Sequence, residues 1–71
     1  MNLSEAGILL KERRHGLGIT QQELSDMAGV ALRTVKLTEL GKGNPSFETL
    51  DKLTQILGLE IQLSIRSLNN G

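Results

Sequence analysis

The sequence predicts an all-α fold, a compact bundle of four to five helices, with a β-strand at its C-terminal end. Apolar residues recur at helical spacing through most of the 71-residue chain. N-capping residues and glycines mark where each helical segment begins and ends. After Gly58, strict alternation of apolar and polar residues replaces this pattern. We therefore expect a helical domain over residues 1–58, a strand over 59–66 and a frayed tail over 67–71.

The composition allows one small domain and excludes several protein classes. A chain of 71 residues buries only about 60% of its unfolded-state surface, so burial by self-association would stabilise it. Because cysteine is absent, disulfides and thiolate metal sites are excluded. No apolar run approaches the roughly 20 residues that span a bilayer, and the N-terminus lacks the pattern of a signal peptide. We expect a cytoplasmic protein that makes no membrane contact.

The first two helices are predicted over 3–15 and from about 20 to 28. Ser4 is the expected N-cap of the first, whose apolar face is formed by Leu3, Ala6 and Leu10. Thr20 and Glu23 have the spacing of a capping box, in which each side chain bonds the backbone amide of the other. The second helix should bury Leu24, Met27 and Ala28, and Gly29 follows where a left-handed residue permits a sharp turn.

The third and fourth helices follow this turn. The third should start at Ala31 or Leu32 and end at Leu40, with Val35 and either Thr38 or Glu39 facing inward. Its exposed face is then Leu32, Arg33, Lys36 and Leu37. Ser46 is expected to cap the fourth helix, which Gly58 ends and whose apolar stripe is Phe47, Leu50, Leu53, Ile56 and Leu57.

Residues 20–45 therefore contain two short helices joined at Gly29, which is the pattern of a helix-turn-helix. The second helix of such a pair enters the major groove of DNA. The formal net charge of zero argues against nucleic-acid binding, but basic residues gather in and before the motif: Lys11, Arg13, Arg14, Arg33, Lys36 and Lys42. One copy would neutralise few phosphates, so useful affinity for double-stranded DNA requires two copies on one site.

The predicted strand supplies a means of pairing two copies. Its apolar side consists of Leu59, Ile61, Leu63 and Ile65. A single strand leaves its backbone groups unpaired, and the chain contains no second convincing strand. Antiparallel pairing of the same strand from two copies would form a two-fold homodimer and hold two reading helices at the spacing of a palindromic site.

Four stretches of the chain resemble the Cro and phage-repressor type of helix-turn-helix, also called the xenobiotic-response-element family. They are LGITQQEL (17–24), GV (29–30), TV (34–35) and ELGKGNP (39–45), and the resemblance covers roughly residues 10–59. It implies a lambda-repressor-like domain. The extension LGLEIQL (57–63) further looks like the HipB branch, whose members are antitoxins that pair with a HipA-type kinase toxin.

The resemblance implies roles for individual residues. Thr20 caps the second helix and Gln21 anchors a phosphate. Arg33 is the expected base reader, because a guanidinium can bind O6 and N7 of guanine together. The other expected DNA contacts are Ala31, Leu32, Thr34, Lys36, Leu37, Lys42 and Asn44. Arg14 and Glu39 occupy the positions of a structural ion pair between the first and third helices.

Two leucines depart from the family pattern, which commonly has polar residues at the positions of Leu32 and Leu37. They could pack against thymine methyl groups, leave the helix to rely on DNA shape, or form a protein-binding patch. Ala31 likewise stands where a serine or threonine N-cap is common. Met27 and Phe47 are interpreted as core residues. His15 is interpreted as a residue at the C-terminal end of the first helix, where it caps the helix or interacts favourably with the helix dipole.

The residues offer no catalytic set, metal site or cofactor site. His15 is the only histidine, and Gly41-Lys42-Gly43 lacks the spacing and the preceding strand of a phosphate-binding loop. Two functions remain. One is a nucleoid-associated repressor that binds DNA as a homodimer, as the antitoxin of a HipA-like kinase toxin. The other is a protein-interaction module that neutralises such a toxin, with DNA binding secondary.

Overall fold

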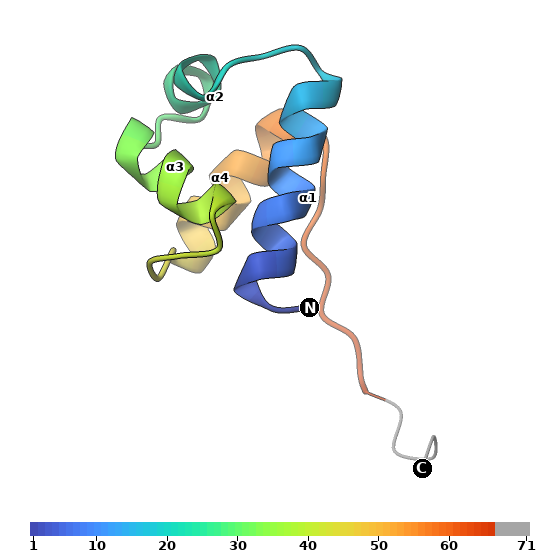
Figure 1. Cartoon of the computed structure of the whole chain (residues 1–71). Coiled ribbons are helices and arrows are strands. Elements are labelled where there is room, and N and C mark those ends of the chain that lie inside the picture. Colours follow the sequence, from blue (N-terminus) through green and yellow to red (C-terminus); the bar gives the residue numbers. More distant parts are fainter. Residues whose placement is uncertain (67–71) are drawn as a thin grey trace.

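Four α-helices form the part of the chain that the computed structural model describes, residues 1–66 (Figure 1). They are α1 (Leu3–Gly16), α2 (Gln21–Ala28), α3 (Leu32–Glu39) and α4 (Phe47–Leu57). Helices α2 and α3 each pack against α1 or α4 as well as against each other. None of the helices in this part of the chain is both long and apolar enough to cross a membrane. The all-helical class and the helix-turn-helix order agree with the prediction.

Helix α1 begins at the predicted residue but with a different cap. Asn2 is the N-cap, and its Oδ1 accepts a hydrogen bond of 2.8 Å from the backbone N–H of Glu5. The prediction that Ser4 caps the helix is wrong, because Ser4 already lies inside the first turn. The helix also continues one residue beyond His15, to Gly16.

The ends of α2 and α3 follow local signals in the sequence. The capping box of α2 is confirmed: Glu23 N–H donates to Thr20 Oγ1 at 3.0 Å, and Thr20 N–H donates to Glu23 Oε1 at 2.9 Å. Gly29 has the left-handed φ of 68° that the turn requires. Helix α3 ends at Glu39, one residue earlier than expected, and Gly41 reverses the chain with a φ of 73°.

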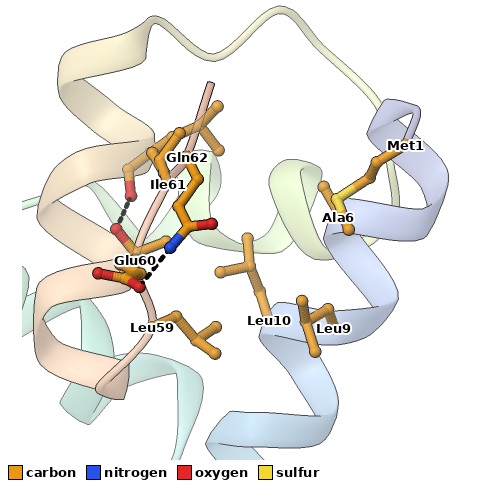
Figure 2. A pocket seen from close by; sticks show the side chains of 10 residues that line it. Met1, Ala6, Leu9, Leu10, Leu59, Glu60, Ile61 and Gln62 are labelled. Carbon is orange, nitrogen blue, oxygen red and sulfur yellow. Dashed lines mark hydrogen bonds between the residues drawn. The ribbon is translucent and has the colours of Figure 1, made fainter. Parts of the chain in front are cut away.

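Residues 59–66 carry no regular secondary structure, so the predicted strand is not formed in this single chain. A strand needs a neighbouring strand for its backbone hydrogen bonds, and residues 1–66 contain none. The segment instead leaves α4 and runs beside α1, where Leu59 faces Leu9 and Leu10 across an apolar groove (Figure 2). Pairing between two copies stays a prediction. The expected frayed tail, 67–71, lies outside the described residues.

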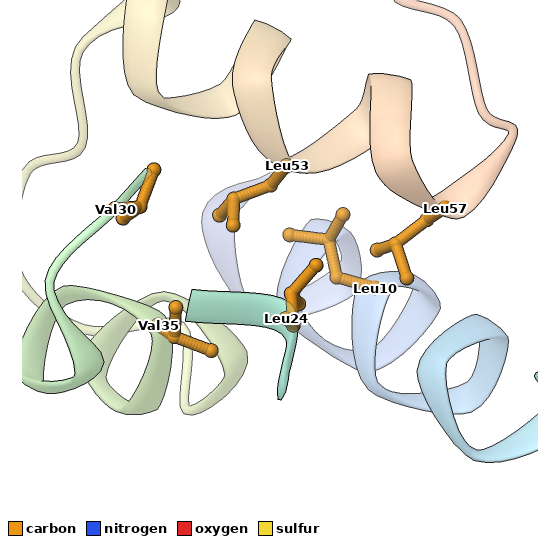
Figure 3. Close-up of a cluster of buried hydrophobic side chains, with 6 residues drawn as sticks. All are labelled: Leu10, Leu24, Val30, Val35, Leu53 and Leu57. Carbon is orange, nitrogen blue, oxygen red and sulfur yellow. The ribbon is translucent and has the colours of Figure 1, made fainter. Parts of the chain in front are cut away.

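The core is a cluster of six buried side chains to which all four helices and the turn before α3 contribute (Figure 3). Its members are Leu10, Leu24, Val30, Val35, Leu53 and Leu57. Burial of each such side chain contributes roughly 1.5–3 kcal/mol to the stability of the folded chain. Because Val35 of α3 belongs to this cluster, the core fixes which face of α3 points outward.

Two residues interpreted as core are exposed. Met27 is 51% exposed because the inward face of α2 is centred on Leu24 and Ser25, and the Ser25 hydroxyl donates to the carbonyl oxygen of Val30. Phe47 is 66% exposed because it is the first residue of α4 and precedes the part of the helix that packs. Leu3, at the equivalent end of α1, is exposed as well.

Candidate nucleic-acid interface

The orientation of α3 is fixed by its buried side, where Val35, Thr38 and Glu39 face the rest of the domain. Glu39 forms a two-point ion pair with Arg14 of α1: Arg14 Nε lies 2.6 Å from Oε2 and Nη2 lies 2.9 Å from Oε1. Arg14 Nη1 also donates to the carbonyl oxygen of Ile19 at 2.9 Å. The contacts of Arg14 therefore link α1, α3 and the loop before α2.

Both members of this pair are charged in the folded chain. Burial alone would raise the pKa of Glu39, but hydrogen bonds from Arg14 and Gln21 and the charge of Arg14 outweigh it, so this pKa lies below its ordinary value. The hydrogen bond to Glu39 raises the pKa of Arg14 against the opposing effect of burial. The cost of removing both charges from water offsets much of their attraction, so we interpret the pair mainly as a contact that sets the orientation of α1 against α3.

Gly7 lets α1 approach the C-terminal end of α3. A Cβ atom at Gly7 would lie only 2.5 Å from the carbonyl oxygen of Thr38 and 2.7 Å from that of Glu39. Only a residue without a side chain permits this distance between the two helices. Sequence reasoning did not assign Gly7 a role, because the close approach depends on a contact between segments about thirty residues apart.

The outward side of α3 carries a continuous surface of mixed cationic and apolar character. A shallow hollow is lined by Leu32, Arg33, Lys36 and Leu37. A second hollow adjoins it through Leu37 and includes Thr34, Lys42 and Asn44. No acidic residue lines either hollow. We call the seven predicted residues that line them the α3 surface: Leu32, Arg33, Thr34, Lys36, Leu37, Lys42 and Asn44.

The remaining predicted DNA contacts lie beside this surface or inside the domain. Ala31 is exposed at the N-cap of α3, and Thr20 caps α2. The side chain of Gln21 points inward, where its Nε2 donates to Glu39 Oε1 at 3.0 Å. The second hollow also includes Ser46 and Thr49, which we did not predict as site residues. The sequence did predict Ser46 as the cap of α4, and this cap could have indicated both residues, because the capped end of α4 lines the same hollow as Lys42 and Asn44.

The predicted dimerisation residues divide into two pairs. Leu59 and Ile61 line the groove with Leu9, Leu10 and Leu50. Leu63 and Ile65 are each 97% exposed. The segment therefore packs on its own domain at its beginning and presents unburied apolar side chains at its end.

Comparison with known proteins assigns the chain to a family. A model of the helix-turn-helix family matches residues 10–63. An uncharacterised HTH-type transcriptional regulator of Methanothermobacter thermautotrophicus is 36% identical over 52 residues, which cover 73% of this chain and 75% of that protein. A regulator of the same description from Archaeoglobus fulgidus is 34% identical over 53 residues, 75% of this chain and 76% of its own length.

A third relative is longer than this chain. The SPbeta prophage-derived HTH-type transcriptional regulator YonR of Bacillus subtilis is 33% identical over 60 residues, which are 84% of this chain but only 56% of YonR. The family model spans α2, α3, α4 and the C-terminal half of α1. The chain belongs to the Cro/C1-type helix-turn-helix family.

Proposed function

We propose that the chain is a sequence-specific DNA-binding transcriptional repressor that inserts α3 into the major groove. The observation that carries the proposal is the α3 surface, in which Arg33, Lys36 and Lys42 lie together on a face without carboxylates. A phosphate backbone attracts such a face, and an exposed helix fits the width of the major groove. The names of the relatives, HTH-type transcriptional regulators, support the same function.

Individual contacts follow from this placement. Arg33 binds a guanine edge, while Lys42 and Asn44 contact phosphates next to the half-site. At the start of α2, Gln21 uses one side-chain N–H to bond Glu39, which leaves its second N–H for a phosphate oxygen. Thr20 positions the same helix end through its capping box. The interior contact of Gln21 therefore couples phosphate binding to the orientation of α3.

The repressor acts as a homodimer in this proposal. Leu63 and Ile65 are apolar, almost fully exposed and separated by one residue, as the apolar side of a strand would be. Antiparallel pairing of residues 59–66 from two copies would satisfy the backbone groups of the segment and cover both side chains. The two α3 helices would then meet half-sites about one helical turn apart on chromosomal DNA, which would place the protein in the cytoplasm.

A second candidate function is that of a HipB-type antitoxin, which would also bind a kinase toxin. Several large apolar side chains remain exposed outside the α3 surface and the C-terminal segment, among them Ile8, Leu40 and Phe47. The resemblance of residues 57–63 to the HipB branch favours this role, and a protein partner would cover such side chains where they form one patch. Co-purification of a kinase encoded by the neighbouring gene would support this role, and an operon without a kinase gene would contradict it.

Fluorescence anisotropy with an operator obtained by in vitro selection tests the DNA-binding proposal. Arg33→Ala should raise Kd by one to two orders of magnitude, the equivalent of about 1–3 kcal/mol, without changing the melting temperature. Lys52→Ala is the matched control, because it removes one positive charge from α4, where Lys52 pairs with Glu48 away from the α3 surface. Equal affinity of Arg33→Ala and Lys52→Ala would contradict base reading by α3.

Analytical ultracentrifugation tests the dimer. Leu63→Asp should convert a dimer into a monomer, since it places a charge at the centre of the paired strands. Leu17→Asp changes an exposed leucine in the loop after α1 and should leave the dimer intact. A Leu63→Asp chain that still sediments as a dimer would exclude the strand pairing.

A further inference from the structure

Two leucines, Leu32 and Leu37, lie on the outward side of α3, where they share one hollow with Arg33 and Lys36. Successive residues of a helix are about 100° apart, so Leu32 and Leu37 lie at the two edges of a face about 140° wide. The two cations lie between them on this face. Both leucines are half-buried, and neither belongs to the core cluster.

Leu37 lies close to the turn after α3. Leu37 and Gly43 line the same hollow, and a Cβ atom added at Gly43 would lie 3.7 Å from Leu37 Cβ and 3.8 Å from its Cδ1. The carbonyl oxygen of Leu37 also accepts a hydrogen bond of 2.9 Å from Lys42 N–H. Leu37 therefore lies beside a turn whose backbone is hydrogen-bonded to its own, and its half-buried side chain lines both hollows.

The charges beside the leucines indicate which partner covers them. Arg33, Lys36 and Lys42 line this surface without a carboxylate, so the partner is anionic. Leucine cannot hydrogen-bond a base edge. Among the bases of DNA, thymine alone presents an apolar group, its 5-methyl, in the major groove. A DNA site with thymines next to a guanine therefore matches both the apolar and the cationic parts of the hollow.

On this basis we propose that Leu32 and Leu37 determine the sequence specificity of the repressor by packing against thymine 5-methyl groups. The proposal rests on the proposed function and adds the chemical feature that the site selects. Each half-site contains thymines at the positions that face Leu32 and Leu37, and a guanine between them that Arg33 binds. Specificity at the thymine positions depends on the methyl group.

Deoxyuridine substitution tests the proposal, because it removes the methyl group and leaves every hydrogen-bonding atom of thymine in place. The operator is selected with the full chain, and each thymine of a half-site is then replaced in turn. We expect Kd to rise about fourfold at one or two thymines, the equivalent of about 0.8 kcal/mol for each methyl group. Leu37→Ala should abolish the effect at one position, whereas Arg33→Ala should preserve it.

Ile8→Ala, which shortens an exposed aliphatic side chain on α1 outside both hollows, is the control and should keep the full sensitivity. If no preferred sequence emerges from the selection, the proposed function itself fails. If a preferred sequence is bound and deoxyuridine changes Kd by less than twofold at every thymine, only the methyl-reading proposal is overturned. It is also overturned if Leu37→Ala dissociates the dimer in sedimentation while the methyl sensitivity persists, because the leucine then contacts protein.

Discussion

Substitution of Gly7 by alanine should weaken the domain although alanine is the better helix former. Alanine in place of glycine favours a helix by about 1 kcal/mol. At Gly7, however, the new Cβ would lie 2.5 Å from the carbonyl oxygen of Thr38 and 2.7 Å from that of Glu39. Backbone atoms cannot rotate away as a flexible side chain can, so α1 and α3 must move apart. Overpacking of this kind costs typically about 1–3 kcal/mol, so after the gain in helix propensity the free energy of unfolding should fall by up to about 2 kcal/mol.

Gly16→Ala provides the matched comparison in the same helix. A Cβ at Gly16 meets no atom within 4 Å, so this variant should be about 0.5 kcal/mol more stable than the wild type. A difference of 1 kcal/mol shifts the melting temperature of a domain this size by roughly 4–8 °C. The two variants should therefore differ by about 0.5–2.5 kcal/mol, so thermal unfolding followed by circular dichroism should place Gly7→Ala about 2–20 °C below Gly16→Ala. Equal melting temperatures would refute the close contact between α1 and α3.

Three further predictions concern the ion pair, the core and the phosphate contacts. Glu39→Gln should cost about 3 kcal/mol at pH 7, because it leaves Arg14 buried without a carboxylate. Folding lowers the pKa of Glu39, so its stabilisation is complete above the unfolded value of about 4.3 and is lost as the pH falls through the folded value. Melting curves should therefore show a smaller difference in melting temperature between wild type and variant at pH 3 than at pH 7. An equal difference at both pH values would contradict the lowered pKa of Glu39. In urea titrations, Leu53→Ala should lower the free energy of unfolding by about 2–5 kcal/mol and Phe47→Ala by less than about 0.5 kcal/mol. Equal decreases for the two variants would place Phe47 in the core. Lys42→Ala should weaken binding to all DNA sequences alike and reduce the slope of log K against log salt by about 1, and a loss confined to one sequence would contradict a phosphate contact.

Signals between residues close in the chain predicted the helices and the outward face of α3. Thr20 and Glu23 satisfy each other across three residues, so their spacing alone specified the start of α2. The inward positions of Val35 and Glu39 left Arg33 and Lys36 outside by helical periodicity. Such signals do not depend on how the helices pack.

Features that depend on packing were missed or misassigned. The hydrogen bond from Gln21 to Glu39 joins residues 18 apart and exists because α2 meets the buried side of α3. Helical periodicity placed Phe47 on the apolar stripe of α4. It could not indicate that this first residue of the helix is left exposed by its neighbours. A strand over 59–66 would need a partner strand that residues 1–66 do not supply, so its pairing stays a prediction.

Contact of DNA with α3 and the turn after it can be mapped residue by residue. NMR titration of the isotopically labelled chain with the selected operator duplex provides this map. We expect the largest changes in amide chemical shift at Arg33, Lys36 and residues 42–44. Changes concentrated on the exposed side of α4 around Lys52, with the amides of α3 unchanged, would contradict this contact.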